Sequence, residues 1–182
     1  MKFRITQINL TIFFIFFAII GRLIPHPPNV TPLVSLSLFI GSRLNRWQAF
    51  IILLVSLCLS DVALHFLLHY PIFGGWTIFS YSGFAIIALM GSRIGTNSSK
   101  SKLLFYLLAS SLGFWLWTNF GVWLQNILYP RTLTGLIECY TVALPFLRNS
   151  LCGDLIWMVI IFDGYKLVCE DILSSLNLSR RA

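Results

Sequence analysis

The chain has 182 residues, of which 57% are hydrophobic and only 10% are charged, and its mean hydropathy is +0.83. About a quarter of the residues in a soluble domain are charged, so this composition excludes a water-soluble protein and predicts an integral membrane protein. The net charge of +7 is spread over short basic clusters between apolar stretches, as topology signals are, so we expect no nucleic-acid partner.

The apolar stretches are continuous rather than alternating, which favours an all-α bundle over a β-barrel. Six transmembrane helices are expected, in one domain spanning residues 1–182, at about residues 5–24, 31–41, 47–66, 76–91, 103–127 and 149–169. The second helix rises only about 16 Å, so it must either be extended by loop residues or lie inside the bundle. Residues 128–147, with Gly135 and Pro145, are expected to form a loop containing a short helix.

The basic residues predict the orientation of the helices, because cytoplasmic loops are enriched in lysine and arginine. They gather at the N-terminus, after the second and fourth helices, and at the C-terminus. Six crossings with both termini cytoplasmic put ten of the thirteen inside and leave Arg22, Arg131 and Arg148 outside. The predicted location is the bacterial cytoplasmic (inner) membrane, crossed several times.

Several polar side chains that are distant in sequence are expected to share one level, at the outer end of this bundle. The candidate substrate-binding residues are His26, Asn29, Asp61, Tyr81, Asn119, Arg148 and Asn149. Ionisable groups at membrane depth are costly and for that reason are usually functional. The loops at residues 67–75 and 128–147 are expected to cover the site.

Asp61 is the clearest of these candidates, because its neighbours in VSLCLSDVALHF are nearly all apolar. Its expected partner is Arg148, which lies in the apolar segment ALPFLRNSLCGDL. Two interpretations stay open: a structural ion pair between the third and sixth helices, or a pair that also contacts a ligand. A buried pair is weak evidence for stability by itself, because desolvation offsets most of the attraction.

The histidines allow more than one interpretation. His26 is flanked by prolines in PHPPN, and prolines fix φ and remove amide donors. It is therefore either held at a set height in a stiff loop or simply faces water at a turn. His65 and His69 have the spacing of metal ligands on one helical face, but no third ligand is near. An interfacial position explains them better, and no metal site is expected.

Signatures of catalysis are missing from the sequence. It contains no HExxH, no GxSxG and no serine–histidine pair at the spacing of an intramembrane protease. The four cysteines form no CxxC pair and have no metal-type spacing. We therefore expect a protein that is not an enzyme and holds no cofactor.

Four parts of the sequence resemble a known family: PHPPNVTP, LSDVALHF, WTNFGVWL with YPRTLTGLIECY, and ALPFLRNSLCGDL. They resemble an uncharacterised bacterial six-helix membrane family, which is similar to the S-components of energy-coupling-factor vitamin transporters. The similarity is greatest to the solitary cobalamin-specific group. It implies capture of a vitamin from outside, tilting in the membrane, and ligand-facing positions for His26, Asp61, Tyr81 and Arg148.

Two features depart from that pattern. S-components that dock onto an energising module usually carry A-x-x-x-A on the first helix, which permits close helix approach. Here Ala18 is followed by Arg22, which favours solitary action over docking. Some cobalamin-binding relatives supply a cysteine near the start of the fourth helix, whereas this chain has none between Cys58 and Cys139.

The sequence thus predicts a substrate-binding membrane protein for the uptake of a vitamin or similar small molecule, with cobalamin or a related cofactor precursor as first candidate. Its partners would be this ligand, the lipid bilayer and, if it docks, an energising module. The alternative is a structural or scaffold membrane subunit without a ligand, whose outer layer is held together by the ion pair. A cavity of several hundred Å³ beside Asp61 would favour uptake, because ligand pockets have volumes of about 300–1,000 Å³.

Overall fold

The computed structural model describes residues 2–95 and 98–167, and the side chains of residues 11–95 and 98–167. The regular secondary structure of these residues is helical, with no strands, which confirms the all-α class. Its elements are α1 (Lys2–Leu23), α2 (Leu33–Arg43), α3 (Arg46–Leu68), α4 (Gly75–Gly91), α5 (Lys100–Leu124), α6 (Leu133–Met158) and the π-helical segment η1 (Val159–Asp163). The expected end of the last helix at residue 169 and the basic residues Arg180 and Arg181 lie outside the described residues.

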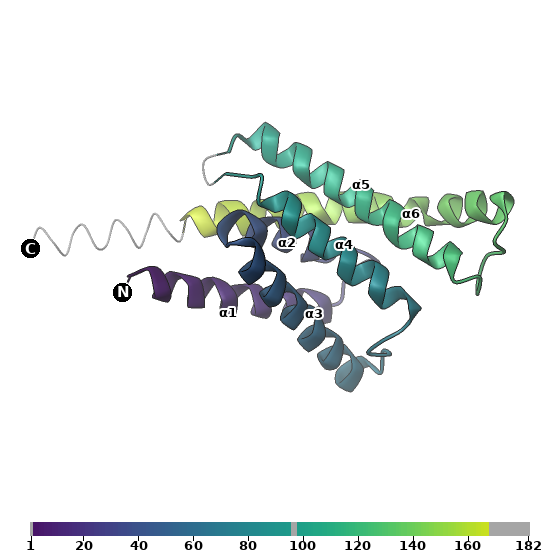
Figure 1. Cartoon of the computed structure of the whole chain (residues 1–182), viewed down its shortest axis with the longest axis horizontal. Coiled ribbons are helices and arrows are strands. Elements are labelled where there is room, and N and C mark those ends of the chain that lie inside the picture. The colour runs from purple at the N-terminus through teal and green to yellow at the C-terminus, as the bar shows by residue number, and fades with distance from the viewer. Residues whose placement is uncertain (1, 96–97, 168–182) are drawn as a thin grey trace, which may run out of the picture.

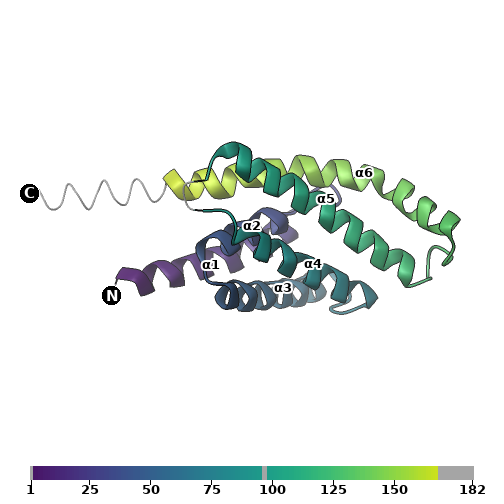
Figure 2. The same cartoon turned by 45° about the horizontal axis from the view of Figure 1, so that its top comes forward.

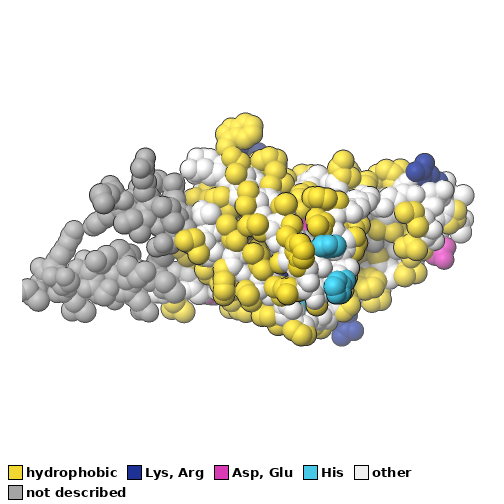
Figure 3. Space-filling view, turned by 90° about the horizontal axis from the view of Figure 1, so that it is seen from below, with side chains coloured by type: hydrophobic (Ala, Val, Ile, Leu, Met, Phe, Trp, Pro, Cys, Tyr) yellow, Lys and Arg dark blue, Asp and Glu magenta, His cyan; other side chains and the backbone are white. Residues whose placement is uncertain are grey.

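Consecutive helices run in alternating directions along the long axis of the molecule, as Figure 1 and Figure 2 show. Three helical stretches are long and apolar enough to cross a membrane: Arg46–Leu68, Lys100–Leu124 and Leu133–Leu167. Each has more than the ~20 residues that a bilayer core requires. The face in Figure 3 is largely hydrophobic where it is described, and its charged side chains are few. Length, composition and surface together indicate a membrane protein.

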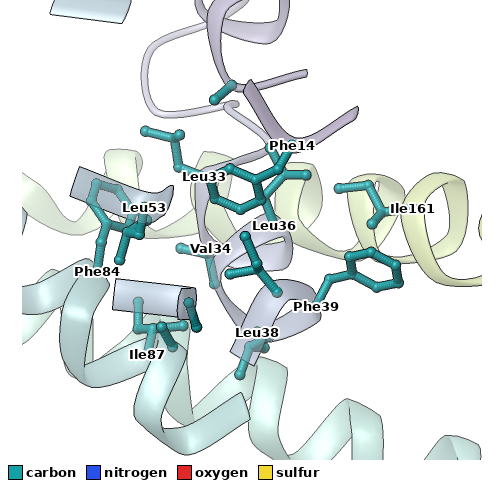
Figure 4. Packing of buried hydrophobic residues seen from close by; sticks show 14 of the residues in the cluster. Phe14, Leu33, Val34, Leu36, Leu38, Phe39, Leu53, Phe84, Ile87 and Ile161 are labelled. Atoms are coloured by element: carbon teal, nitrogen blue, oxygen red, sulfur yellow. The ribbon is translucent and has the colours of Figure 1, made fainter. Parts of the chain in front are cut away.

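The short helix α2 lies inside the bundle, which is one of the two alternatives that its length left open. Every residue from Leu33 to Gly41 is buried, and α2 contacts each of the other helices and η1. Figure 4 shows its side chains among residues of the surrounding elements: Phe14 of α1, Leu53 of α3, Phe84 and Ile87 of α4, and Ile161 of η1. A helix that is apolar on all sides is stable only where it is covered on all sides.

Two glycines let α2 and α4 approach until their backbones touch. A Cβ added to Gly41 would overlap the carbonyl oxygen of Ala88, and a Cβ added to Gly91 would overlap the carbonyl oxygen of Leu38. Small residues at helix interfaces are the usual means of close approach in membranes, where packing replaces the hydrophobic driving force. The α2–α4 contact is also the most extensive contact between two elements of the described bundle.

The last helix starts much earlier than the sequence predicted. Residues 128–147 were expected to be a loop with a short helix, but α6 begins at Leu133 and contains Pro145. The side chain of Thr132 caps the start by accepting a hydrogen bond from the amide of Gly135 (3.1 Å). A proline removes one intrahelical donor, and membrane helices tolerate this because neighbouring groups satisfy the freed carbonyl. The loop prediction was therefore wrong from residue 133 onward.

We expect Gly41→Ala to destabilise the protein by at least about 1–3 kcal/mol, because the new methyl group must displace backbone rather than a flexible side chain. Gly113→Ala is the matched control, since a Cβ there meets nothing within 4 Å and alanine favours a helix over glycine by about 0.5–1 kcal/mol. Thermal unfolding in detergent, followed by tryptophan fluorescence, measures both. Equal stability of the two variants would contradict the backbone contact.

Candidate functional site

Three charged or polar side chains from three helices meet near one end of the bundle. Arg22 is in the last turn of α1, Asp61 lies about two turns before the end of α3, and Tyr81 is in the second turn of α4. The Arg22 guanidinium lies 2.6 Å from Oδ1 of Asp61, and the Tyr81 hydroxyl donates to Oδ2 at 2.6 Å. Arg22 also donates to the hydroxyl of Ser60. We call Arg22, Ser60, Asp61 and Tyr81 the Asp61 cluster.

The Asp61 cluster is almost closed to solvent. The side chain of Asp61 is 3% exposed and that of Arg22 is 17% exposed. Both carboxylate oxygens have a partner, so the cost of removing this charge from water is offset by an ion pair and a charge-assisted hydrogen bond. Removing one partner would leave an unpaired charge in the bundle.

The predicted partner of Asp61 was wrong. Arg148 is exposed on α6 and forms no ion pair with a described residue. Arg22 instead forms the ion pair with Asp61 that was expected of Arg148. Arg22 was expected at the outer end of the first helix, but it was not included among the site residues. In the structure, Phe14, Ala18 and Arg22 follow each other at intervals of four on the inner face of α1. That spacing was the signal that could have identified Arg22.

A cavity of about 620 Å³ opens beside the Asp61 cluster. We call it the Asp61 cavity. It is lined by residues of α1, α3 and the start of α4, and by residues of the α1–α2 and α3–α4 loops. The polar ones include Arg22, His26, Asn29, Thr31, Asp61 and Tyr70, and the apolar ones include Leu64, Leu68, Pro71 and Trp76. Three of the predicted site residues, His26, Asn29 and Asp61, therefore lie together.

A second, smaller cavity of about 280 Å³ lies between α2, α4, α5 and α6. We call it the Asp154 cavity, because Asp154 is the only acidic residue in its lining. Asn119, another of the predicted site residues, also lines it. Asn29 and Thr31 border both cavities, so the α1–α2 loop is the partition between them. The sequence analysis did not anticipate two cavities.

The remaining predicted residues have supporting positions. Tyr81 donates to Asp61 and does not line the Asp61 cavity, and Asn149 donates to the carbonyl of Pro28 at 3.3 Å. Arg148 lines neither cavity. Of the two predicted covering loops, residues 67–75 contribute to the lining of the Asp61 cavity, whereas most of residues 128–147 are helical.

The loop that carries His26 is tightly turned. Nδ1 of His26 lies 2.9 Å from the carbonyl oxygen of Pro27, and the amide of Val30 donates to the same carbonyl at 3.1 Å. Asn29 has a positive φ of 66°, a conformation that asparagine adopts more readily than most residues. His26 is half-buried and lines the Asp61 cavity.

The sequence model of a family of unknown function, DUF6580, matches residues 3–176. The chain belongs to this family. No curated protein and no solved structure matches the sequence. Membership of DUF6580 carries no activity with it, so the case for a function rests on the two cavities and the charges beside them.

We expect Arg22→Gln to destabilise the protein by about 3–5 kcal/mol, because it leaves the carboxylate of Asp61 buried without a cation. Arg148→Gln should change stability by less than about 0.5 kcal/mol, since that side chain is exposed and forms no ion pair with a described residue. The double variant Arg22→Gln/Asp61→Asn should recover much of the loss. Denaturant titration in mixed micelles measures the stability of all three variants. A larger loss of stability for Arg148→Gln than for Arg22→Gln would support the predicted Asp61–Arg148 pair instead.

Proposed function

We propose that this protein is a substrate-binding membrane protein that takes up a vitamin or similar small molecule, bound in the Asp61 cavity. The observation that carries the proposal is the cavity itself. Its volume of about 620 Å³ is within the ~300–1,000 Å³ of small-molecule sites, and a buried ion pair forms part of its wall. An ionisable group kept at membrane depth next to an open space is the arrangement expected of a ligand pathway.

The chemistry of the walls defines the kind of ligand. Arg22, Asp61 and His26 offer both donors and acceptors on one side, while Trp76 and Leu68 offer an aromatic and an aliphatic surface. Such a lining fits a molecule with a flat or apolar part and several hydrogen-bonding groups. Cobalamin or a related cofactor precursor stays the first candidate, on the strength of the family resemblance. A whole cobalamin is larger than this cavity, so a smaller precursor fits it better.

The proposal includes six crossings of the bacterial cytoplasmic membrane, with both termini in the cytoplasm. The alternating helix directions support it, since α1 begins at the end of the bundle that the described part of the last helix reaches in Figure 1. Helix α2, which has only 11 residues, is shielded from lipid by its neighbours. With this orientation the Asp61 cavity opens to the outside.

Solitary action is favoured over docking onto an energising module. Ala18 is fully buried, and Arg22, one turn later, is held by Asp61. The face of α1 that would carry a small-residue docking motif is thus occupied by the interior of the bundle. A module that used this face would first have to break the ion pair.

A structural subunit without a ligand is the second candidate, and one observation favours it. Both carboxylate oxygens of Asp61 are already satisfied by Arg22 and Tyr81, so the cluster needs no ligand to balance its charge. In that case the cluster would serve only to hold α1, α3 and α4 together.

Native mass spectrometry of the purified protein distinguishes these two functions. We expect a co-purified small molecule on the wild type, and at least about a tenfold lower occupancy in His26→Ala and Trp76→Ala, which remove wall groups without touching the ion pair. Trp47→Ala is the control for loss of an aromatic ring, because Trp47 is exposed and lines neither cavity. Equal occupancy in all variants, or none in the wild type after gentle extraction, would favour the structural subunit.

Cysteine labelling tests the orientation. In a cysteine-free background, Phe73→Cys in the α3–α4 loop should react with a membrane-impermeant maleimide in whole cells, and Gly95→Cys in the α4–α5 loop should react only after lysis. Both residues are exposed in the structure, so the membrane alone would explain a difference. The reverse pattern would place the Asp61 cavity on the cytoplasmic side.

A further inference from the structure

Asp154 is a buried carboxylate for which the described side chains provide no cation. It is 2% exposed, and its one side-chain partner is the hydroxyl of Ser111, which donates to Oδ2 at 2.6 Å. Its backbone carbonyl accepts a hydrogen bond from Ser35 of α2 at 2.9 Å, which fixes this turn of α6 against the central helix. A buried carboxylate that remains charged needs a positive partner, and here the chain supplies only a neutral one.

The Asp154 cavity has room for that partner. Asp154 lines its 280 Å³ directly, together with a group of hydroxyl and amide side chains: Ser80, Ser111, Thr118, Asn119 and Ser150. Asn119 uses its amide nitrogen to donate to the carbonyl of Trp115 at 2.8 Å, and no described residue donates to its side-chain oxygen. The polar part of the wall is therefore rich in acceptors.

Another part of the wall is aromatic. It is formed by Phe84, Phe114, Trp115 and Phe146. Phe84 and Phe114 stack with ring centroids 4.3 Å apart, and Trp115 is fixed by a 3.0 Å hydrogen bond from its indole nitrogen to the carbonyl of Ala143. Aromatic faces attract organic cations, and ammonium groups in particular. A hard metal ion would instead require six or more oxygen ligands, which a half-aromatic wall does not supply.

We propose that the Asp154 cavity is a binding site for a small organic cation, whose ammonium group pairs with the carboxylate of Asp154 and lies against the aromatic wall. This site goes beyond the proposed function, because it is a second cavity that can hold a ligand whether or not the Asp61 cavity serves in uptake. The ammonium group would have the role at Asp154 that the guanidinium of Arg22 has at Asp61.

The test measures binding to the full-length protein in detergent by tryptophan fluorescence and thermal shift, since Trp115 lines the site. The probes are methylammonium, choline and phenethylammonium chlorides, with 2-phenylethanol as the uncharged counterpart of the last and sodium chloride at equal ionic strength. At least one ammonium probe should bind, and phenethylammonium should bind at least about tenfold more tightly than 2-phenylethanol. This comparison needs no variant, so it stands even if a substitution at Asp154 prevents folding.

Asp154→Asn should reduce ammonium binding at least about tenfold. The matched control is Asp163→Asn, because Asp163 is exposed and lies outside the cavity. Equal binding of charged and uncharged probes, no binding of any ammonium probe, or stabilisation by sodium alone would overturn the inference. These in-vitro outcomes are separate from failure of the uptake proposal, which shows as unchanged ligand occupancy in His26→Ala and Trp76→Ala.

Discussion

The insertion of α2 into the centre of the bundle is the constraint on which the rest of the structure depends. An eleven-residue apolar helix can be stable at membrane depth only if other helices surround it. The glycines at positions 41 and 91 make this possible, because they let its backbone lie directly against that of α4. With α2 in the centre, the other helices are arranged around it, and the loop that leads into it must pass through the outer part of the bundle. That loop is the wall shared by both cavities.

The two buried carboxylates of the described bundle, those of Asp61 and Asp154, have different partners. Asp61 receives a guanidinium from α1 and a hydroxyl from α4, so its charge is balanced within the chain. Asp154 receives a serine hydroxyl and faces a cavity with an aromatic wall. Burial alone would make both groups costly. Asp61 thus has a cation among the described residues, whereas the one side-chain partner of Asp154 is neutral.

Much of the fold could be predicted from the sequence because the membrane simplifies the pattern. Apolar stretches bounded by basic or turn-forming residues gave the first five helices to within about three residues at each end. Helix α6 could not be predicted in the same way, because Pro145 and Gly135 are breakers in water and are tolerated in a packed membrane helix. Hydropathy describes which segments prefer lipid, but it does not describe which carbonyls a neighbouring helix can satisfy.

The site could be predicted only in part, for a related reason. His26, Asn29 and Asp61 were found because a polar residue in an apolar context is visible in one dimension. The identity of the partner of Asp61 depends on which way α1 faces, and that follows from the intervals of four between Phe14, Ala18 and Arg22 rather than from the composition of GRLIP. Asp154 was visible as an acid in the last helix, but the aromatic residues that line the same cavity come from α4, α5 and α6 and are brought together only by the fold.

The α1–α2 loop lies between the two cavities and is bonded to α6. Asn29 and Thr31 border both of them, and Pro28, next to Asn29, accepts a hydrogen bond from Asn149 of α6. Asp154 lies on the same helix, five residues after Asn149, and its carbonyl is bonded to Ser35 of α2. Helix α6 is therefore bonded to the loop at Asn149 and to α2 at Asp154. Tightly packed interiors shift between discrete arrangements rather than deform gradually. Any rearrangement of the Asp154 cavity that moves this loop would therefore also move a wall of the Asp61 cavity.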